Sequence, residues 1–79
     1  MNHARVISTG RVSVPNTGQP ALQIDTDLPN RAERAFYVEP DTPAPVTGDF
    51  VQWGRRKALI GQRWVRKIGY SFDPDAPLH

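Results

Sequence analysis

Apolar and polar residues alternate with a period of two in several short segments of this 79-residue chain. Residues 6–14 and 21–26 show the clearest alternation, which is typical of strands with one buried face and one solvated face. Proline-containing stretches at residues 15–20 and 40–45 separate these segments, because proline cannot donate a hydrogen bond within a central strand. The sequence therefore predicts an all-β fold of short antiparallel strands.

Five strands follow from this pattern. They are predicted at residues 6–14, 21–26, 35–39, 50–56 and 62–70, with residues 57–61 as the connection between the last two. Asn30 and Glu33 loosely match a capping box, which permits one helical turn at residues 31–34. Five short strands at even spacing predict a small antiparallel barrel or a strongly coiled sheet.

The length of the chain predicts a single domain, placed at residues 1–72, since there is no room for a second hydrophobic core. Residues 73–79 contain Asp73 and Asp75 among prolines and predict a flexible acidic tail. The chain has no cysteine, which excludes disulfides, thiolate metal sites and a cysteine nucleophile. The sequence shows neither an export signal nor an apolar run that would span a membrane, so a cytoplasmic location is expected.

Positive charge is concentrated in residues 51–70, which contain six of the ten basic residues and no acidic residue. This segment carries a formal charge of +6, and the remainder, with four basic and eight acidic residues, carries −4. Both tryptophans lie in the same segment. Cations interleaved with aromatic rings are typical of proteins that bind single-stranded nucleic acid, where phosphates are neutralised and bases are stacked.

The candidate nucleic-acid-binding residues are five cations and three aromatic residues: Arg55, Arg56, Lys57, Arg63, Lys67, Trp53, Trp64 and Tyr70. If four of the cations contact phosphates, the log–log dependence of the binding constant on salt should have a slope of about −3. The alternative role of the cations is a solvated edge that opposes aggregation. The alternative role of the two tryptophans is core packing, because each buries about 150–250 Å².

The carboxylates do not indicate a catalytic or metal site. Two pairs have the spacing that places both members on one face of a strand: Asp25 with Asp27, and Glu39 with Asp41. Both pairs adjoin loops, and the two histidines stand at opposite ends of the sequence, so neither pair has a histidine companion within the predicted fold. A non-enzymatic protein without a metal or cofactor is expected.

Residues 48–54 (GDFVQWG), a basic turn and residues 64–68 (WVRKI) together resemble the last two strands of many bacterial OB-fold proteins. The resemblance implies a five-stranded OB-like barrel that binds single strands or sugars, or that serves as a protein-contact module. The OB-fold commonly has a helix between its third and fourth strands, where this chain has the proline-rich residues 40–48. An SH3-like barrel is therefore the alternative.

Two functions remain open at this point. The first is an accessory protein that binds single-stranded nucleic acid through the basic hairpin, with the acidic tail either competing for the cations or acting as a solvated linker. The second is a protein-interaction module, or a small inhibitor of the phage or plasmid type, that binds an acidic protein or pairs with an edge strand. Homo-oligomerisation is a third interpretation, since so small a domain has a thin core. No membrane partner is expected.

Overall fold

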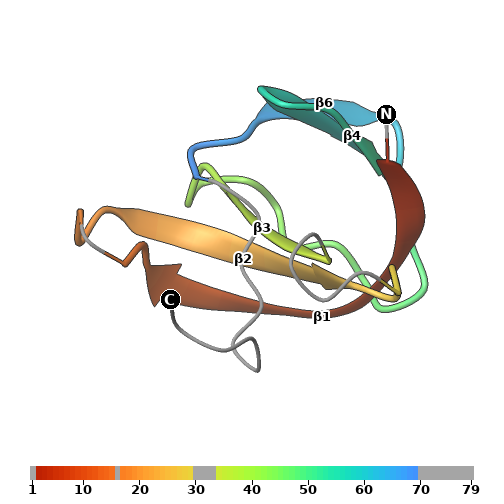
Figure 1. Ribbon diagram of the computed structural model, residues 1–79, viewed down its shortest axis with the longest axis horizontal. Coiled ribbons are helices and arrows are strands. Elements are labelled where there is room, and N and C mark those ends of the chain that lie inside the picture. Colours follow the sequence, from red (N-terminus) through yellow and green to blue (C-terminus); the bar gives the residue numbers. More distant parts are fainter. Residues whose placement is uncertain (1, 16, 30–33, 70–79) are drawn as a thin grey trace.

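The computed structural model describes residues 2–15, 17–29 and 34–69, which form one antiparallel sheet of six strands. The strands are β1 (Asn2–Ser13), β2 (Pro20–Thr26), β3 (Ala35–Val38), β4 (Phe50–Trp53), β5 (Lys57–Ile60) and β6 (Arg63–Arg66). Their order in the sheet is β3-β2-β1-β4-β5-β6 (Figure 1). The expected all-β antiparallel class is confirmed, and the described residues contain no helix.

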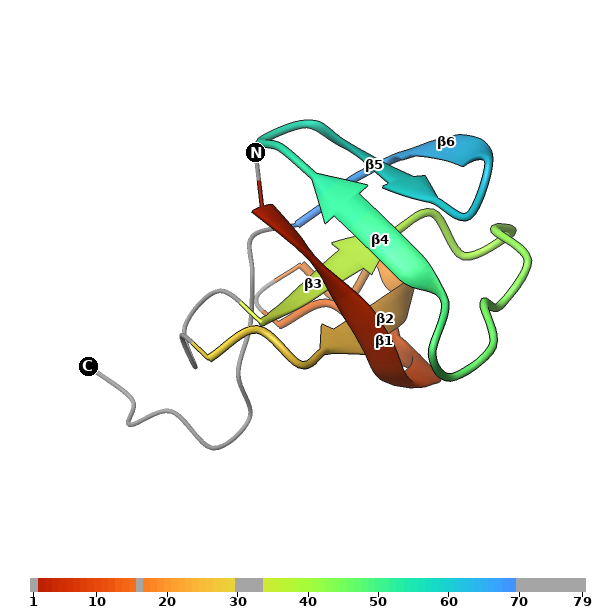
Figure 2. The same ribbon diagram turned by 90° about the vertical axis from the view of Figure 1, so that its right-hand side faces the viewer.

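The long strand β1 belongs to both halves of the sheet. Its first residues pair with β4, from Asn2 opposite Trp53 to Arg5 opposite Phe50, and its second half pairs with β2. The register of the β1–β2 ladder shifts between Val6 and Ser8, an irregularity that bends a strand and increases its twist. The strands β4 and β6 consequently arch over β2 and β3 (Figure 1), and the first part of β1 runs alongside β4 (Figure 2).

The sheet is not closed into a barrel, so the expected five-stranded barrel is not confirmed. Beside the outermost strands β3 and β6, an isolated bridge joins Val38 to Lys67, next to which the Ile68 N–H donates to the Tyr37 carbonyl at 3.0 Å. The strand count also differs, because the predicted connection at residues 57–61 contains β5. Ala58 and Ile60 are buried there, which favours a strand over an exposed loop.

The main core lies between the two halves of the sheet. Its buried residues are Ala4, Val6, Leu22, Ile24, Phe36, Val38, Val51, Trp53, Ala58 and Ile60. Trp53 is 1% exposed, and its ring centroid lies 4.9 Å from that of Phe36 at an interplanar angle of 30°. Aromatic pairs in such tilted arrangements contribute about 0.5–1.5 kcal/mol beyond the burial of their area. The two rings therefore join β3 to β4 across the core.

A second, smaller cluster surrounds Tyr37 on the other side of β3. Tyr37 packs with Val14 and Ala21, and Ile68 covers the group from the segment after β6. Gly69 comes so close that an added Cβ would lie 2.7 Å from Cδ2 of Tyr37. Burial raises the pKa of the Tyr37 phenol. The segment after β6 is thus fixed against β3 by close packing as well as by the isolated bridge.

Several expectations fall on residues that the structure does not describe. These are residues 31–33 of the helical turn expected at residues 31–34, the role of Tyr70, the domain boundary at residue 72 and the acidic tail at residues 73–79. The described part of the chain includes no helix of the length and apolarity needed to cross a membrane.

Candidate nucleic-acid interface

Alternate residues of β1, β4, β5 and β6 point away from the core and form one continuous surface, the outer face. Its members are His3, Arg5, Phe50, Gln52, Lys57, Leu59, Trp64 and Arg66. The assignment follows from the register, because paired residues share a face and Val51, Trp53 and Ala58 are buried on the opposite side. The outer face contains no carboxylate among these members.

The ladders place four members of the outer face in one row across the sheet. His3 pairs with Gln52, Gln52 with Leu59, and Leu59 with Trp64. Two further pairs flank this row, namely Arg5 opposite Phe50 and Lys57 opposite Arg66. Phe50 therefore lies directly opposite the basic residue Arg5. Trp64 lies two residues along the strand from the basic pair Lys57 and Arg66.

Trp64 on β6 presents the largest exposed aromatic ring of the described residues. Half of the residue, 50%, is accessible to solvent. The Lys57 ammonium lies 4.6 Å from the ring centroid, a cation–π contact that contributes about 0.5–1 kcal/mol at an exposed site. An indole in this position keeps a large apolar area in contact with water.

Phe50 on β4 provides a second exposed ring, with 47% of the residue accessible. The guanidinium of Arg5 lies 5.8 Å from its centroid, and the His3 ring is stacked at 6.0 Å and 22°. Arg5 is oriented by a hydrogen bond from Nη1 to the Gly48 carbonyl at 3.0 Å. The outer face thus repeats one motif twice, an exposed ring with a cation beside it.

Three of the sequence-predicted cations lie together at one end of the β4–β5 hairpin. Arg55 and Arg56 are exposed in the turn, and Lys57 begins β5 beside Trp64. Arg66, opposite Lys57, extends the group, and its side chain is 70% exposed with Nε 3.5 Å from Glu39 Oε1. This end of the outer face is therefore basic, with one acidic residue at its border.

Lys67 has a different environment from the other cations. Its ammonium donates to the Gly54 carbonyl at 2.8 Å and lies 5.3 Å from the centroid of Phe36. Partial burial lowers the pKa of the Lys67 amine. Lys67 therefore fastens the β4–β5 turn to the segment after β6.

The structure separates the remaining predicted residues. Trp53 lies in the core, whereas Trp64 is on the outer face. Arg63 occupies an inward position on β6, opposite Ile60, and lines a cleft on the other side of the β5–β6 hairpin. Tyr70 lies outside the described residues. Of the eight predicted residues, the structure brings together Arg55, Arg56, Lys57 and Trp64.

Sequence reasoning missed the contribution of β1 to this surface. His3 and Arg5 join the outer face because β1 begins at Asn2 and pairs with β4, whereas alternation had suggested a start at residue 6. Phe50 was detectable, since its parity opposes that of Val51 and Trp53 within one strand. Long-range pairing has no such local signal.

In the described part of the chain, no group of three or more His, Asp or Glu side chains is placed to hold a metal ion. No family model, curated protein or solved structure matches the chain. The function is therefore inferred from the geometry of the surfaces themselves.

Proposed function

We propose that this protein is a non-enzymatic accessory protein that binds single-stranded nucleic acid on its outer face. The observation that carries the proposal is the repeated pair of an exposed ring and a cation, Trp64 with Lys57 and Phe50 with Arg5. Both pairs lie on a strand surface without a carboxylate. The resemblance to OB-fold proteins stays a prediction and is not needed for this function.

The chemistry of the ligand follows from the two kinds of side chain. Unpaired bases stack on exposed aromatic rings, and each stacked base contributes about 1–3 kcal/mol. Phosphates are neutralised by Lys57, Arg5 and the turn cations Arg55 and Arg56, all of which are exposed. A duplex hides the faces of its bases, so a single strand fits this surface better.

The width of the surface suits a short stretch of nucleotides. Phe50 and Trp64 lie two strands apart in the sheet, on β4 and β6, which corresponds to about 10 Å across the strands. The half-buried Leu59 lies on the strand between them, in register with Gln52 and Trp64, and offers apolar contact. A segment of a few nucleotides therefore spans both rings.

Fluorescence anisotropy with a labelled oligothymidylate tests this function. Wild-type protein should bind at about 50 mM salt, with a log–log salt slope between about −2 and −3, and should bind the matched duplex more weakly. Trp64→Ala should reduce affinity by about 5- to 150-fold, the loss expected for one stacked base. Val46→Ala is the control, because it trims a 67% exposed apolar residue in a loop outside the outer face. Absence of binding at low salt, or binding indifferent to salt, would contradict the proposal.

A second candidate function uses the same face for an acidic protein partner. Tryptophan and arginine are enriched among residues that dominate protein interfaces, and Trp64 lies near Leu59 and close to Arg66 through the ladder. A pull-down from nuclease-treated lysate that yields one stoichiometric acidic protein, with no oligonucleotide binding in the titration, would favour this function. Oligomeric state and cellular location stay predictions, and light scattering measures the former.

A further inference from the structure

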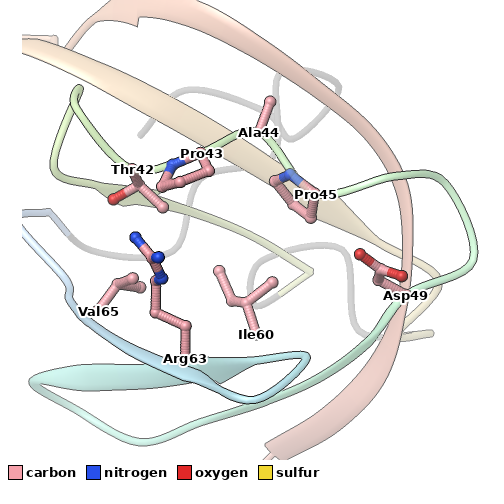
Figure 3. Close-up of a pocket in the computed structure, with 8 residues that line it drawn as sticks. All are labelled: Thr42, Pro43, Ala44, Pro45, Asp49, Ile60, Arg63 and Val65. Atoms are coloured by element: carbon pink, nitrogen blue, oxygen red, sulfur yellow. The ribbon is translucent and has the colours of Figure 1, made fainter.

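A cleft of about 200 Å³ lies between the proline-rich loop after β3 and the inward side of the β5–β6 hairpin (Figure 3). Its lining mixes polar and apolar groups, with Pro43 and Pro45 on one side, Ile60 and Val65 on the other, and Thr42, Asp49 and Arg63 among them. The cleft is on the opposite side of the hairpin from the outer face, since Trp64 and Arg63 alternate along β6.

Two opposite charges stand in this cleft without neutralising each other. The Arg63 guanidinium projects into one end beside Thr42, and the Asp49 carboxylate lies at the other end (Figure 3). No ion pair joins Arg63 to Asp49, and neither has an ion-pair partner among the residues that the structure describes. Asp49 is oriented through Oδ2, which accepts a hydrogen bond from the Val46 N–H at 3.1 Å.

The arrangement specifies the chemistry of a ligand at both ends. The planar guanidinium presents paired N–H donors that match a carboxylate, and the Asp49 carboxylate accepts hydrogen bonds from an ammonium group. Between the two charged groups, Pro45 and Ile60 offer apolar contact to a short hydrocarbon chain. A polyanion would meet the Asp49 charge, so the nucleic-acid ligand of the outer face does not fit here.

We propose that the cleft binds a small zwitterion of the amino-carboxylate class, with its carboxylate on Arg63 and its ammonium on Asp49. This site is independent of the outer face, because none of the exposed ring–cation pairs lines it. Binding of a zwitterion and binding of an oligonucleotide can therefore succeed or fail separately.

The probes are ω-amino acids of increasing length, from 3-aminopropionate to 6-aminohexanoate, titrated into the full chain and followed by amide chemical shifts in NMR spectra. One length should bind most tightly, with saturable shifts at Ile60 and Val65, because only one spacing of charges matches the cleft. Hexanoate and hexylamine, which each lack one charge, should bind about tenfold more weakly than the best zwitterion. Absence of saturation for every probe, or equal affinity for hexanoate and the zwitterions, would overturn the proposal.

Two substitutions test the assigned residues. Arg63→Gln and Asp49→Asn should each weaken the best probe by about tenfold, and the asparagine oxygen can still accept the Val46 N–H bond. Arg56→Gln is the control, since it removes an exposed cation that does not line the cleft. Arg63 is exposed, so its substitution should leave the fold intact, which far-UV circular dichroism checks. Unchanged affinity in Arg63→Gln would overturn the assignment even if oligonucleotide binding is confirmed.

Discussion

The core beneath β4 and the outer face above β6 each contain one tryptophan, and the two side chains have opposite surroundings. Trp53 is 1% exposed and packs against Phe36, whereas Trp64 is 50% exposed and lies under the Lys57 ammonium. Both residues come from the same basic, aromatic stretch of sequence. Composition therefore does not distinguish a buried ring from an exposed ring; the parity of each residue within its paired strand does.

The largest expected effect contrasts these two tryptophans. Trp53→Ala should lower the free energy of unfolding by about 3–5 kcal/mol, which is comparable with the whole contribution of so small a core. Trp64→Ala should lower it by less than about 1 kcal/mol, the value of an exposed cation–π contact. Urea denaturation measures both.

If Trp53→Ala does not fold, the milder variant Trp53→Phe still allows the two tryptophan positions to be compared. Trp53→Phe keeps most of the ring and removes an indole N–H that is buried without a hydrogen-bond partner in the described part of the chain. It should therefore cost less than Trp53→Ala and still more than Trp64→Phe. Equal costs for the two positions would show that Trp64 is also structural.

A second, intermediate effect contrasts Gly69, which packs closely on Tyr37, with Gly10, which has open space at its Cβ position. Gly69→Ala would place its Cβ 2.7 Å from Cδ2 of Tyr37 and should lower stability by about 1–3 kcal/mol through overpacking. Gly10→Ala meets nothing within 4 Å and should be neutral or slightly stabilising. Thermal unfolding of the two variants gives the comparison. A Gly69→Ala protein as stable as Gly10→Ala would mean that the segment after β6 does not pack tightly on Tyr37.

The smallest effect concerns Lys67, which lies at the boundary between the two regions. Burial lowers its pKa below the ordinary 10.5, so the unfolded chain binds this proton more readily as pH approaches 10.5. The contribution of Lys67 to stability should therefore rise with pH in that window. Lys67→Met removes this contribution. The free energy of unfolding of wild type minus that of the variant should therefore increase from pH 7 to about pH 10.

The effect of Tyr37 on the pH dependence of stability has the opposite sign to that of Lys67. Its raised pKa means that the unfolded chain loses the phenol proton first above 10.0, so stability falls there as pH rises. This contribution is common to wild type and Lys67→Met and cancels in their difference. Urea denaturation of both proteins across this pH range isolates the lysine, and a difference that shrinks with pH would contradict its desolvation.

Much of the fold could be predicted from local alternation, and the errors have identifiable causes. That Val51 and Trp53 share one face of a strand followed from period two, as did the strands at β2 and β3. β5 was missed because its four residues lie between Gly54 and Gly61 and begin with a lysine, which resembles a basic turn. A short strand is stabilised by its neighbours in the ladder, which local sequence does not contain.

The candidate site was less predictable than the fold. The basic turn and Trp64 were found from the concentration of charge, but Arg63 and Lys67 were grouped with them although one lines the cleft and the other is partly buried. A shift of one residue, caused by a bulge or a turn, moves a side chain to the opposite face of the sheet, and so changes which face a cation occupies. The cleft between Arg63 and Asp49 brings together the loop between β3 and β4 and the β5–β6 hairpin, which no spacing in the sequence indicates.

The membership of β1 in both ladders has a consequence for how the chain reaches this structure. Hairpins such as β4–β5 and β5–β6 can form locally within microseconds, but Asn2 must find Trp53 across most of the chain. Proteins dominated by such distant pairings fold in milliseconds to seconds. Because Arg5 meets Phe50 only through that ladder, we expect the complete outer face to appear late in folding, after the hairpin that holds Lys57 and Trp64.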